Sequence, residues 1–168
     1  MKPKLYLETS IVSYLTARPS HDLIRAAHQQ LTRDWWETRS SFDLYISQLV
    51  LDEAKAGNAE AAGRRLSALG EALLLELTPE TGWLAREILS QGGMPAKAYV
   101  DAAHVALAAV HGLDYLLTWN YAHLANPIAQ ERLEAICHRL ALPTPLLVSP
   151  ETIPQVRFGQ SIRRRRSR

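Results

Sequence analysis

The chain has a single cysteine, Cys137, among its 168 residues, which excludes an intramolecular disulfide. It also lacks any apolar run of the roughly 20 residues needed to cross a bilayer. Lys2 and Lys4 stand beside an apolar run, but that run reaches Glu8 too soon to serve as a signal peptide. Nothing in the sequence points to an oxidising compartment or to a membrane-spanning segment, so we expect a cytoplasmic protein.

Several motifs of common site chemistry are missing too. No glycine-rich loop that would cradle phosphates is present, and no His/Cys spacing is typical of a zinc site. A phospho-accepting receiver would need two adjacent acidic residues near the first strand and an aspartate ending a central strand, and neither occurs. The chemistry of any site must therefore come from other residue types.

Charge is unevenly distributed along the chain. Six arginines lie beyond position 156, at 157, 163 to 166 and 168, with no acidic residue among them. The other 13 basic residues face 17 acidic residues, so the body carries a net charge of −4. The basic end suits contact with nucleic acid or a membrane surface, and the alternative is a solvated, disordered tail.

Apolar segments and turn residues alternate along the rest of the chain. They predict short strands at 4–8, 43–47, 72–77, 114–119 and 145–149. Helical periodicity predicts helices at 20–39, 48–56, 59–69, 79–91, 95–111 and 127–142. Ser47 and Thr78 are expected to cap the helices that follow them. Strands alternating with helices predict an α/β/α sandwich around a mostly parallel sheet of four to five strands.

Four oxygen-bearing side chains are expected at one edge of this sheet, because ligands of open parallel sheets bind beyond the carboxyl ends of the strands. Glu8 ends the first strand and Asn120 follows the fourth. Glu53 lies about two turns into the helix after the second strand, and Asp101 about two turns into an otherwise apolar helix. Such oxygens suit Mg²⁺ or Mn²⁺, ions that activate water for attack on phosphorus. Clustered carboxylates should raise the pKa of at least one of them before an ion binds.

Each carboxylate also has an ordinary interpretation. Glu8 alone is compatible with a solvated strand end, and Asp52 is an alternative to Glu53 as the residue that points inward. Lys97, four residues before Asp101, offers a helical ion pair. That pair is worth only a few tenths of a kcal/mol and does not explain a charge inside so apolar a helix.

Three further residues are assigned away from the centre of the site. His104 and His111 share a face of the helix that carries Asp101, and we interpret them as packing residues or as supports for the metal ligands. Asp114 precedes its strand and is therefore predicted at the opposite edge of the sheet. None of the three is predicted as a metal ligand.

The stretches YLETSIVSYL, AKAYVDAAHVALAAVHGLDYLLTWNYAHLAN and LLVSPETI resemble the PIN domain, in particular VapC-like toxins of type II toxin–antitoxin systems. The resemblance covers nearly all of the chain up to about Pro154, so we predict a PIN-like domain at 1–154 and a basic, disordered tail at 155–168. It implies a Rossmann-like sandwich and a metal-dependent endoribonuclease that holds one or two Mg²⁺ or Mn²⁺ ions. It also implies an RNA substrate, a small antitoxin partner and a homodimer.

The family's functional positions can be read off this chain. The positions of its acidic residues fall on Glu8, Glu53 and Asp101, the predicted metal ligands, and its fourth position falls on Asn120. These four are the predicted catalytic residues. Three hydroxyls are expected to hydrogen-bond the carboxylates into position: Thr9, Ser10 and Thr118.

Two of these positions depart from the family pattern. Glu8 has one methylene more than the usual aspartate, and Asn120 offers an oxygen without charge. The alternative to a nuclease is therefore a catalytically degenerate PIN-like module that binds RNA or a protein partner.

Overall fold

The computed structural model describes residues 1–154, so the predicted tail lies outside the described residues. Five strands form one sheet in the order β3-β2-β1-β4-β5, and every neighbouring pair is parallel. They are β1 (Lys4–Leu7), β2 (Asp43–Ser47), β3 (Leu73–Leu75), β4 (Tyr115–Leu117) and β5 (Leu146–Val148). The predicted fold class is confirmed, with all five strands parallel.

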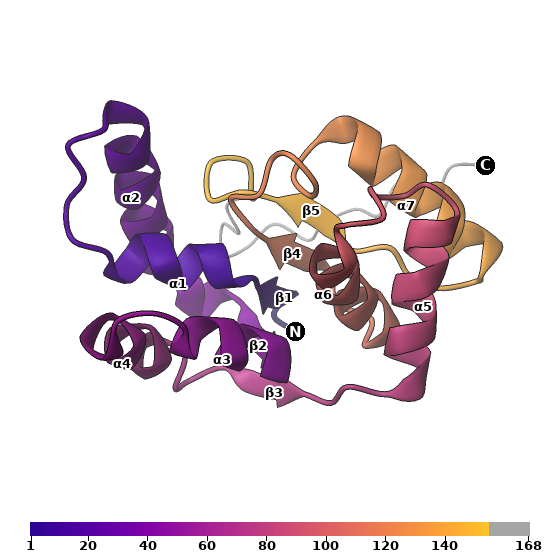
Figure 1. Ribbon diagram of the computed structural model, residues 1–168, viewed down its shortest axis with the longest axis horizontal. Helices are drawn as coiled ribbons and strands as arrows, with labels where there is room; N and C mark the ends of the chain where they lie inside the picture. The colour runs from indigo at the N-terminus through magenta and orange to yellow at the C-terminus, as the bar shows by residue number, and fades with distance from the viewer. Residues whose placement is uncertain (155–168) are drawn as a thin grey trace.

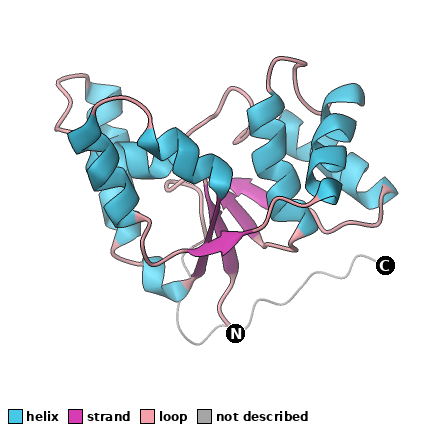
Figure 2. Cartoon of the chain, turned by 60° about the horizontal axis from the view of Figure 1, so that its bottom comes forward, coloured by secondary structure: helices cyan, strands magenta, loops and turns pink. Residues whose placement is uncertain are grey.

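Helices cover both faces of the sheet. Figure 2 shows the strands between two groups of helices, and Figure 1 identifies the groups as α1 to α4 and α5 to α7. The helices are α1 (Thr9–Thr16), α2 (Leu23–Trp36), α3 (Gln48–Lys55), α4 (Ala59–Ala68), α5 (Pro79–Ser90), α6 (Tyr99–Val110) and α7 (Pro127–Arg139), with a 3₁₀ turn at Arg39–Ser41. Because both faces are covered, the middle strand is buried, and Leu5, Tyr6 and Leu7 are fully inaccessible.

The strand order reverses direction between β1 and β4. From β1 the chain moves outward through β2 and β3, and then returns to place β4 on the other side of β1. Such a reversal leaves a crevice at the carboxyl ends of the two strands, where ligands of open α/β sheets bind. The next residues after β1 and β4 are Glu8 and Thr118, and the backbone N–H of Glu8 donates to Leu117 O at 3.1 Å.

Within residues 1–154, one α-helix was not predicted from the sequence. Helix α1 begins directly after β1, and Glu8 is its N-cap, a position that usually carries Ser, Thr, Asp or Asn. Its buried residues Ile11 and Val12 are β-branched, which lowers helix propensity. Neither the cap nor the composition marks this helix, which is held by packing against the core.

The start of α6 is a correction. A helix was predicted from residue 95, but α6 begins at Tyr99, so Asp101 lies in its first turn instead of about two turns in. Residues 95–98 form a turn closed by Ala98 N–H donating to Pro95 O at 2.8 Å. Met94 and Ala98 are buried, and their packing overrides the local helix propensity.

The predicted caps have different outcomes. Thr78 caps α5 through a hydrogen bond from Thr81 N–H. Ser47 stands at the N-cap of α3 but makes no capping hydrogen bond with its side chain, because its hydroxyl bonds the Tyr6 hydroxyl at 2.7 Å.

Among the helices of the described residues, none combines the length and apolar character needed to span a membrane.

Gly93 gives a test of how the chain turns from α5 toward α6. A Cβ at Gly93 would lie 2.8 Å from Ile88 O and 2.9 Å from Ile136 Cδ1, whereas a Cβ at Gly63 in α4 meets nothing within 4 Å. We expect Gly93→Ala to destabilise the fold by about 1–3 kcal/mol through overpacking. Gly63→Ala, the matched control, should stabilise it by up to about 1 kcal/mol. Urea unfolding measures both, and equal stability of the two variants would contradict the packing described here.

Candidate metal centre

Glu8 bends its side chain back over the start of α1. Both of its carboxylate oxygens accept from Ser10 N–H, at 3.2 and 3.1 Å. Oε2 also accepts from the Ser10 hydroxyl and, at 2.7 Å, from Thr118 Oγ1. The side chain is 9% exposed, so these donors replace the water that a buried carboxylate loses.

Glu53 comes from α3 and faces the same place. Its Oε2 accepts from Thr9 Oγ1 and lies 3.2 Å from His104 Nε2. Burial raises the pKa of this carboxyl, but the hydrogen bonds from His104 and Thr9 and the charge of His104 outweigh it, and the net pKa is lowered. Glu53 is therefore not a carboxyl whose pKa crowding raises, because Thr9 and His104 donate to it.

His104 links Glu53 to the interior of the sheet. Its Nδ1 lies 2.8 Å from the Tyr6 hydroxyl, which in turn lies 2.7 Å from Ser47 Oγ. All three side chains are buried, with His104 at 1% exposed. Burial and the neighbouring carboxylates Glu8 and Glu53 raise the pKa of the Tyr6 phenol despite the Ser47 hydrogen bond, so Tyr6 is a neutral donor and acceptor.

Three residues thus present donor atoms to one point. One oxygen of Glu8, one oxygen of Glu53 and one ring nitrogen of His104 all lie within 4.8 Å of one another. Two predicted ligands are brought together, and a histidine that was interpreted as a packing or supporting residue joins them.

Asp101 and Asn120 form a second group with a residue that the sequence analysis missed. The Asn120 amide donates to Asp101 Oδ1 at 3.1 Å, and His123 Nδ1 lies 2.6 Å from Asp101 Oδ2. The carbonyl oxygen of Asn120 accepts from His123 N–H at 3.1 Å. Asn120 therefore orients Asp101 and His123 with both ends of its amide. His123 lies three residues after Asn120, at the predicted edge of the sheet, and that place is the only sequence signal for it.

Thr118 connects the two groups. Its hydroxyl donates to Glu8 Oε2 and accepts from Asn120 N–H at 2.9 Å, and the Asn120 side chain reaches Asp101. Thr118 is fully buried. Hydrogen bonds through Thr118 thus link Glu8 to Asn120 and Asp101, whereas Glu53 lies near Glu8 without a hydrogen bond to it within residues 1–154.

The contacts decide between the ordinary interpretations. Asp52 bonds Gln48 and Lys55 on the exposed side of α3, which leaves Glu53 as the residue that points inward. Within residues 1–154 the partners of Asp101 are Asn120 and His123, and no ion pair with Lys97 is formed.

Two residues set aside by the sequence analysis lie away from this edge. Asp114 lies at the opposite end of the sheet, as predicted, where it accepts from Lys4 N–H at 2.8 Å. His111, at the end of α6, has its Nε2 2.9 Å from Glu76 O. Neither contributes to the two groups.

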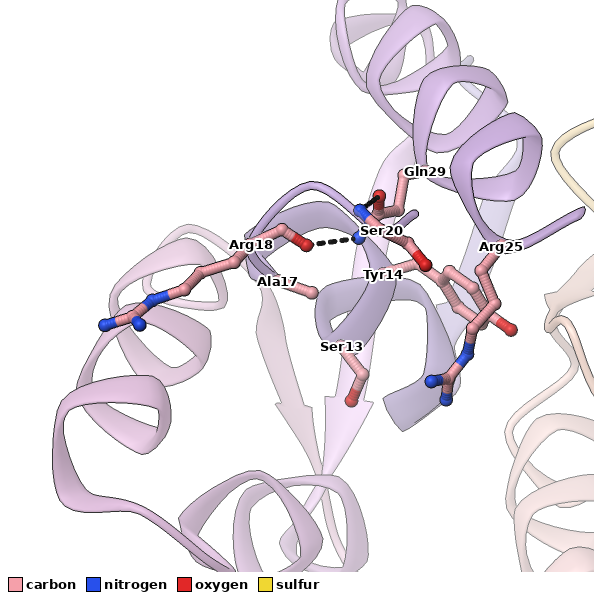
Figure 3. Close-up of a pocket in the computed structure, with 7 residues that line it drawn as sticks. All are labelled: Ser13, Tyr14, Ala17, Arg18, Ser20, Arg25 and Gln29. Atoms are coloured by element: carbon pink, nitrogen blue, oxygen red, sulfur yellow. Dashed lines mark hydrogen bonds between the residues drawn. The ribbon is translucent and has the colours of Figure 1, made fainter. Parts of the chain in front are cut away.

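A pocket of about 230 Å³ lies between α1 and α2 (Figure 3). Its lining residues are Ser13, Tyr14, Ala17, Arg18, Ser20, Arg25 and Gln29. Gln29 lies beside Ser20 and Arg18 in Figure 3, and its side chain bonds Ser20 N–H and Arg18 O. Ser13 lies one turn after Thr9 on the same face of α1, so the pocket opens roughly 6 Å along the helix from the hydroxyl that holds Glu53.

Comparison with known proteins agrees with this architecture. The PIN domain family matches residues 5–127, which is more than half of the chain. The chain belongs to the PIN domain family. PIN domains are generally nucleases. No curated protein matches the chain.

A solved structure resembles this PIN domain along most of its length. It is described as the crystal structure of VapBC2 from Rickettsia felis bound to a DNA fragment from their promoter. The match has a TM-score of 0.50 and 17% sequence identity, and it covers 86% of this chain and 97% of the other. At that identity the likeness concerns the fold.

The donor set of this PIN domain fits a divalent ion. Within residues 1–154, Glu8 Oε1 accepts only the 3.2 Å contact from Ser10, and Glu53 Oε1 accepts no hydrogen bond. Most of the hydrogen bonds to each carboxylate therefore go to Oε2, and Oε1 keeps lone pairs. Ligands that are fixed and not fully satisfied are the arrangement that metal sites require.

Thr118 offers a test of how Glu8 is held. Thr118→Val removes a buried donor to the carboxylate while keeping the shape, and we expect a loss of about 1–3 kcal/mol in the free energy of unfolding. Thr118→Ser keeps the hydroxyl and should lose clearly less. Urea unfolding at neutral pH compares them, and a valine variant as stable as the serine variant would count against the described bond.

Proposed function

We infer that this PIN domain is a divalent-metal-dependent endoribonuclease that hydrolyses RNA phosphodiester bonds, and that it is the VapC-like toxin of a toxin–antitoxin pair. The observation that carries the proposal is the set of acidic side chains at the β1–β4 switch, each oriented by dedicated hydrogen bonds. Glu8, Glu53 and Asp101 are the proposed metal ligands, and the cofactor is Mg²⁺ or Mn²⁺.

The bound ion and the side chains of the site have different proposed roles. A bound divalent ion supplies activation of water and stabilisation of the charge that develops on phosphorus. Thr9 holds Oε2 of Glu53, which leaves Oε1 to orient the attacking water or accept its proton. Asn120 and His123 hold Asp101 at the start of α6, where the helix dipole favours its negative charge.

The α1–α2 pocket is the proposed contact for RNA phosphates near the cleavage site. The Arg25 guanidinium makes no hydrogen bond or ion pair within residues 1–154, and Arg18 is 84% exposed with only a 3.8 Å contact to Glu60. Arg64 and Arg65 carry the same charge, but their guanidinium groups bond the carbonyl groups of Thr16 and Ala54. We assign Arg64 and Arg65 a structural role.

A protein partner is proposed from the family and from exposed apolar surface. The edge strand β3 exposes Leu73 and Leu74 at 57% each, and α2 begins with Leu23 and Ile24 at 85% and 69%. Surfaces of this kind suit a small antitoxin and a second copy of the chain. The similarity in fold to the VapBC2 structure supports the first of these. Cytoplasm is the proposed location.

Removing a ligand charge tests the activity. Purified protein should cleave single-stranded RNA with Mn²⁺ or Mg²⁺ and stop when EDTA is added. Asp101→Asn and Glu53→Gln should each lower the cleavage rate about 100-fold or more, the equivalent of about 3 kcal/mol in the barrier. Asp52→Asn, which removes the exposed carboxylate beside Glu53, is the matched control and should keep the rate.

Metal binding, measured together with cleavage by Asp101→Asn, separates the two candidate functions. The Asn120 side chain is uncharged, and its amide nitrogen donates to Asp101, so the fourth position gives the site no additional acidic ligand. This observation favours the second candidate function, a catalytically degenerate module that binds RNA or a protein partner. Calorimetric titration with Mn²⁺ decides between them: no binding at millimolar metal, or cleavage retained in Asp101→Asn, would reject the nuclease.

The pocket predicts a change in the salt dependence of RNA binding. If Arg18 and Arg25 each neutralise one phosphate of a single strand, the double alanine variant should flatten the slope of log K against log salt by about 1.4. Arg86→Ala, at an exposed arginine on α5, is the control and should leave the slope unchanged. Binding is measured by fluorescence anisotropy in EDTA, so that cleavage does not interfere. An unchanged slope in the double variant would remove the pocket from the RNA path.

A further inference from the structure

A histidine ring nitrogen lies among the donor atoms of the candidate metal site, where only acidic side chains were predicted as ligands. His104 Nε2 lies 3.2 Å from Glu53 Oε2, and it belongs to the group of donor atoms that all lie within 4.8 Å of one another. Neighbouring ligands of one ion at about 2.1 Å are separated by about 3 Å, so the nitrogen already stands at the spacing of a ligand beside Glu53. His104 is 1% exposed and its other nitrogen is occupied, so the ring is fixed in this direction.

The surroundings of His104 allow its Nε2 lone pair to face an ion. With Nε2–H donating to Glu53, Nδ1 accepts from the Tyr6 hydroxyl. With the proton on Nδ1, that nitrogen donates to Tyr6 oxygen, and Tyr6 donates to Ser47 Oγ. Both hydroxyls can donate and accept, so Tyr6 satisfies Nδ1 in either tautomer. A histidine ligand held through its second ring nitrogen is the arrangement found in most metal sites.

We propose that His104 Nε2 is a ligand of the same ion as Glu8 and Glu53, and that it gives the site a preference for first-row transition ions such as Mn²⁺ over Mg²⁺. The reason is that Mg²⁺ takes oxygen ligands and keeps its waters, whereas an imidazole nitrogen adds affinity for transition ions. Tyr6 is the positioning residue, because it fixes the ring without touching the ion. This inference rests on the proposed function, since it concerns the ion of the same site.

Metal binding, measured without RNA, tests the proposal. Calorimetry on the full chain should give Mn²⁺ an affinity about 10-fold or more above that of Mg²⁺. His104→Gln should weaken Mn²⁺ binding by about 10- to 100-fold and change Mg²⁺ binding by less than about 3-fold. Pulsed electron paramagnetic resonance of the Mn²⁺-loaded protein should show a directly bound ¹⁴N nucleus in the native chain, and that signal should be lost in His104→Gln.

Two further variants keep the test decisive if His104→Gln folds poorly. Tyr6→Phe removes the partner of Nδ1 and should lower the preference for Mn²⁺ over Mg²⁺, while the bound ¹⁴N signal stays. His111→Gln, on the same helix but bonded to Glu76 O, is the control and should keep both the preference and the signal.

The contrary outcomes are distinct. Mn²⁺ binding without a bound ¹⁴N signal, or with the same preference in His104→Gln as in the native chain, would overturn the role of His104 and reduce it to a hydrogen-bond donor to Glu53. The proposed nuclease would survive that result. Failure of the native chain to bind either ion would overturn both.

Discussion

The carboxylate of Glu8 is the group on which the site depends. It stands at the end of the central strand, where the fold leaves almost no water, and its charge is supported by Ser10 and Thr118. Ser10 belongs to α1 and Thr118 follows β4, so this one carboxylate joins a helix to a neighbouring strand. A buried charge stabilises an arrangement only where donors meet it, and here those donors determine how α1 leaves β1 and how the loop after β4 begins.

Two hydrogen-bond networks meet beside Glu8. In the first, Glu53 of α3 and His104 of α6 contact each other, Tyr6 continues the hydrogen bonds into the sheet, and the donor atoms of Glu53 and His104 lie within 4.8 Å of a Glu8 oxygen. The second passes from Glu8 through Thr118 and Asn120 to Asp101. Each carboxylate is met by a hydroxyl, an imidazole or an amide, which explains why the pKa of Glu53 falls despite partial burial. Hydrogen bonds from the protein thus orient the acidic side chains, and within residues 1–154 Oε1 of Glu53 accepts none of them.

The two halves of the chain each contribute one side of the site. Glu8 and Glu53 come from the β1–α3 part, and Asp101, Asn120 and His123 come from the part after α5. They meet because β4 returns to pair with β1 and places the carboxyl ends of both strands together. Across this junction His104 contacts Tyr6, which is 98 residues away in the chain, and Glu53, which is 51 residues away. A site built this way exists only in the folded protein, so its polar bonds contribute both to stability and to chemistry.

The sequence by itself determined the sandwich, the parallel sheet and the edge at which the acidic residues gather. These features follow from the hydrophobic periodicity and from the order of the elements along the chain. Apolar strands that alternate with helices favour a parallel sheet, and the carboxyl ends of parallel strands lie at the same edge. Only the tertiary structure decided that α1 starts at an unusual Glu8 cap, that Asp101 lies in the first turn of α6, and that Ser47 bonds Tyr6 instead of capping α3. It also decided that His104 and His123 join the carboxylates. The physical reason is that each of these outcomes depends on a hydrogen bond or a packing contact between distant segments, and local propensity and spacing carry no information about such partners.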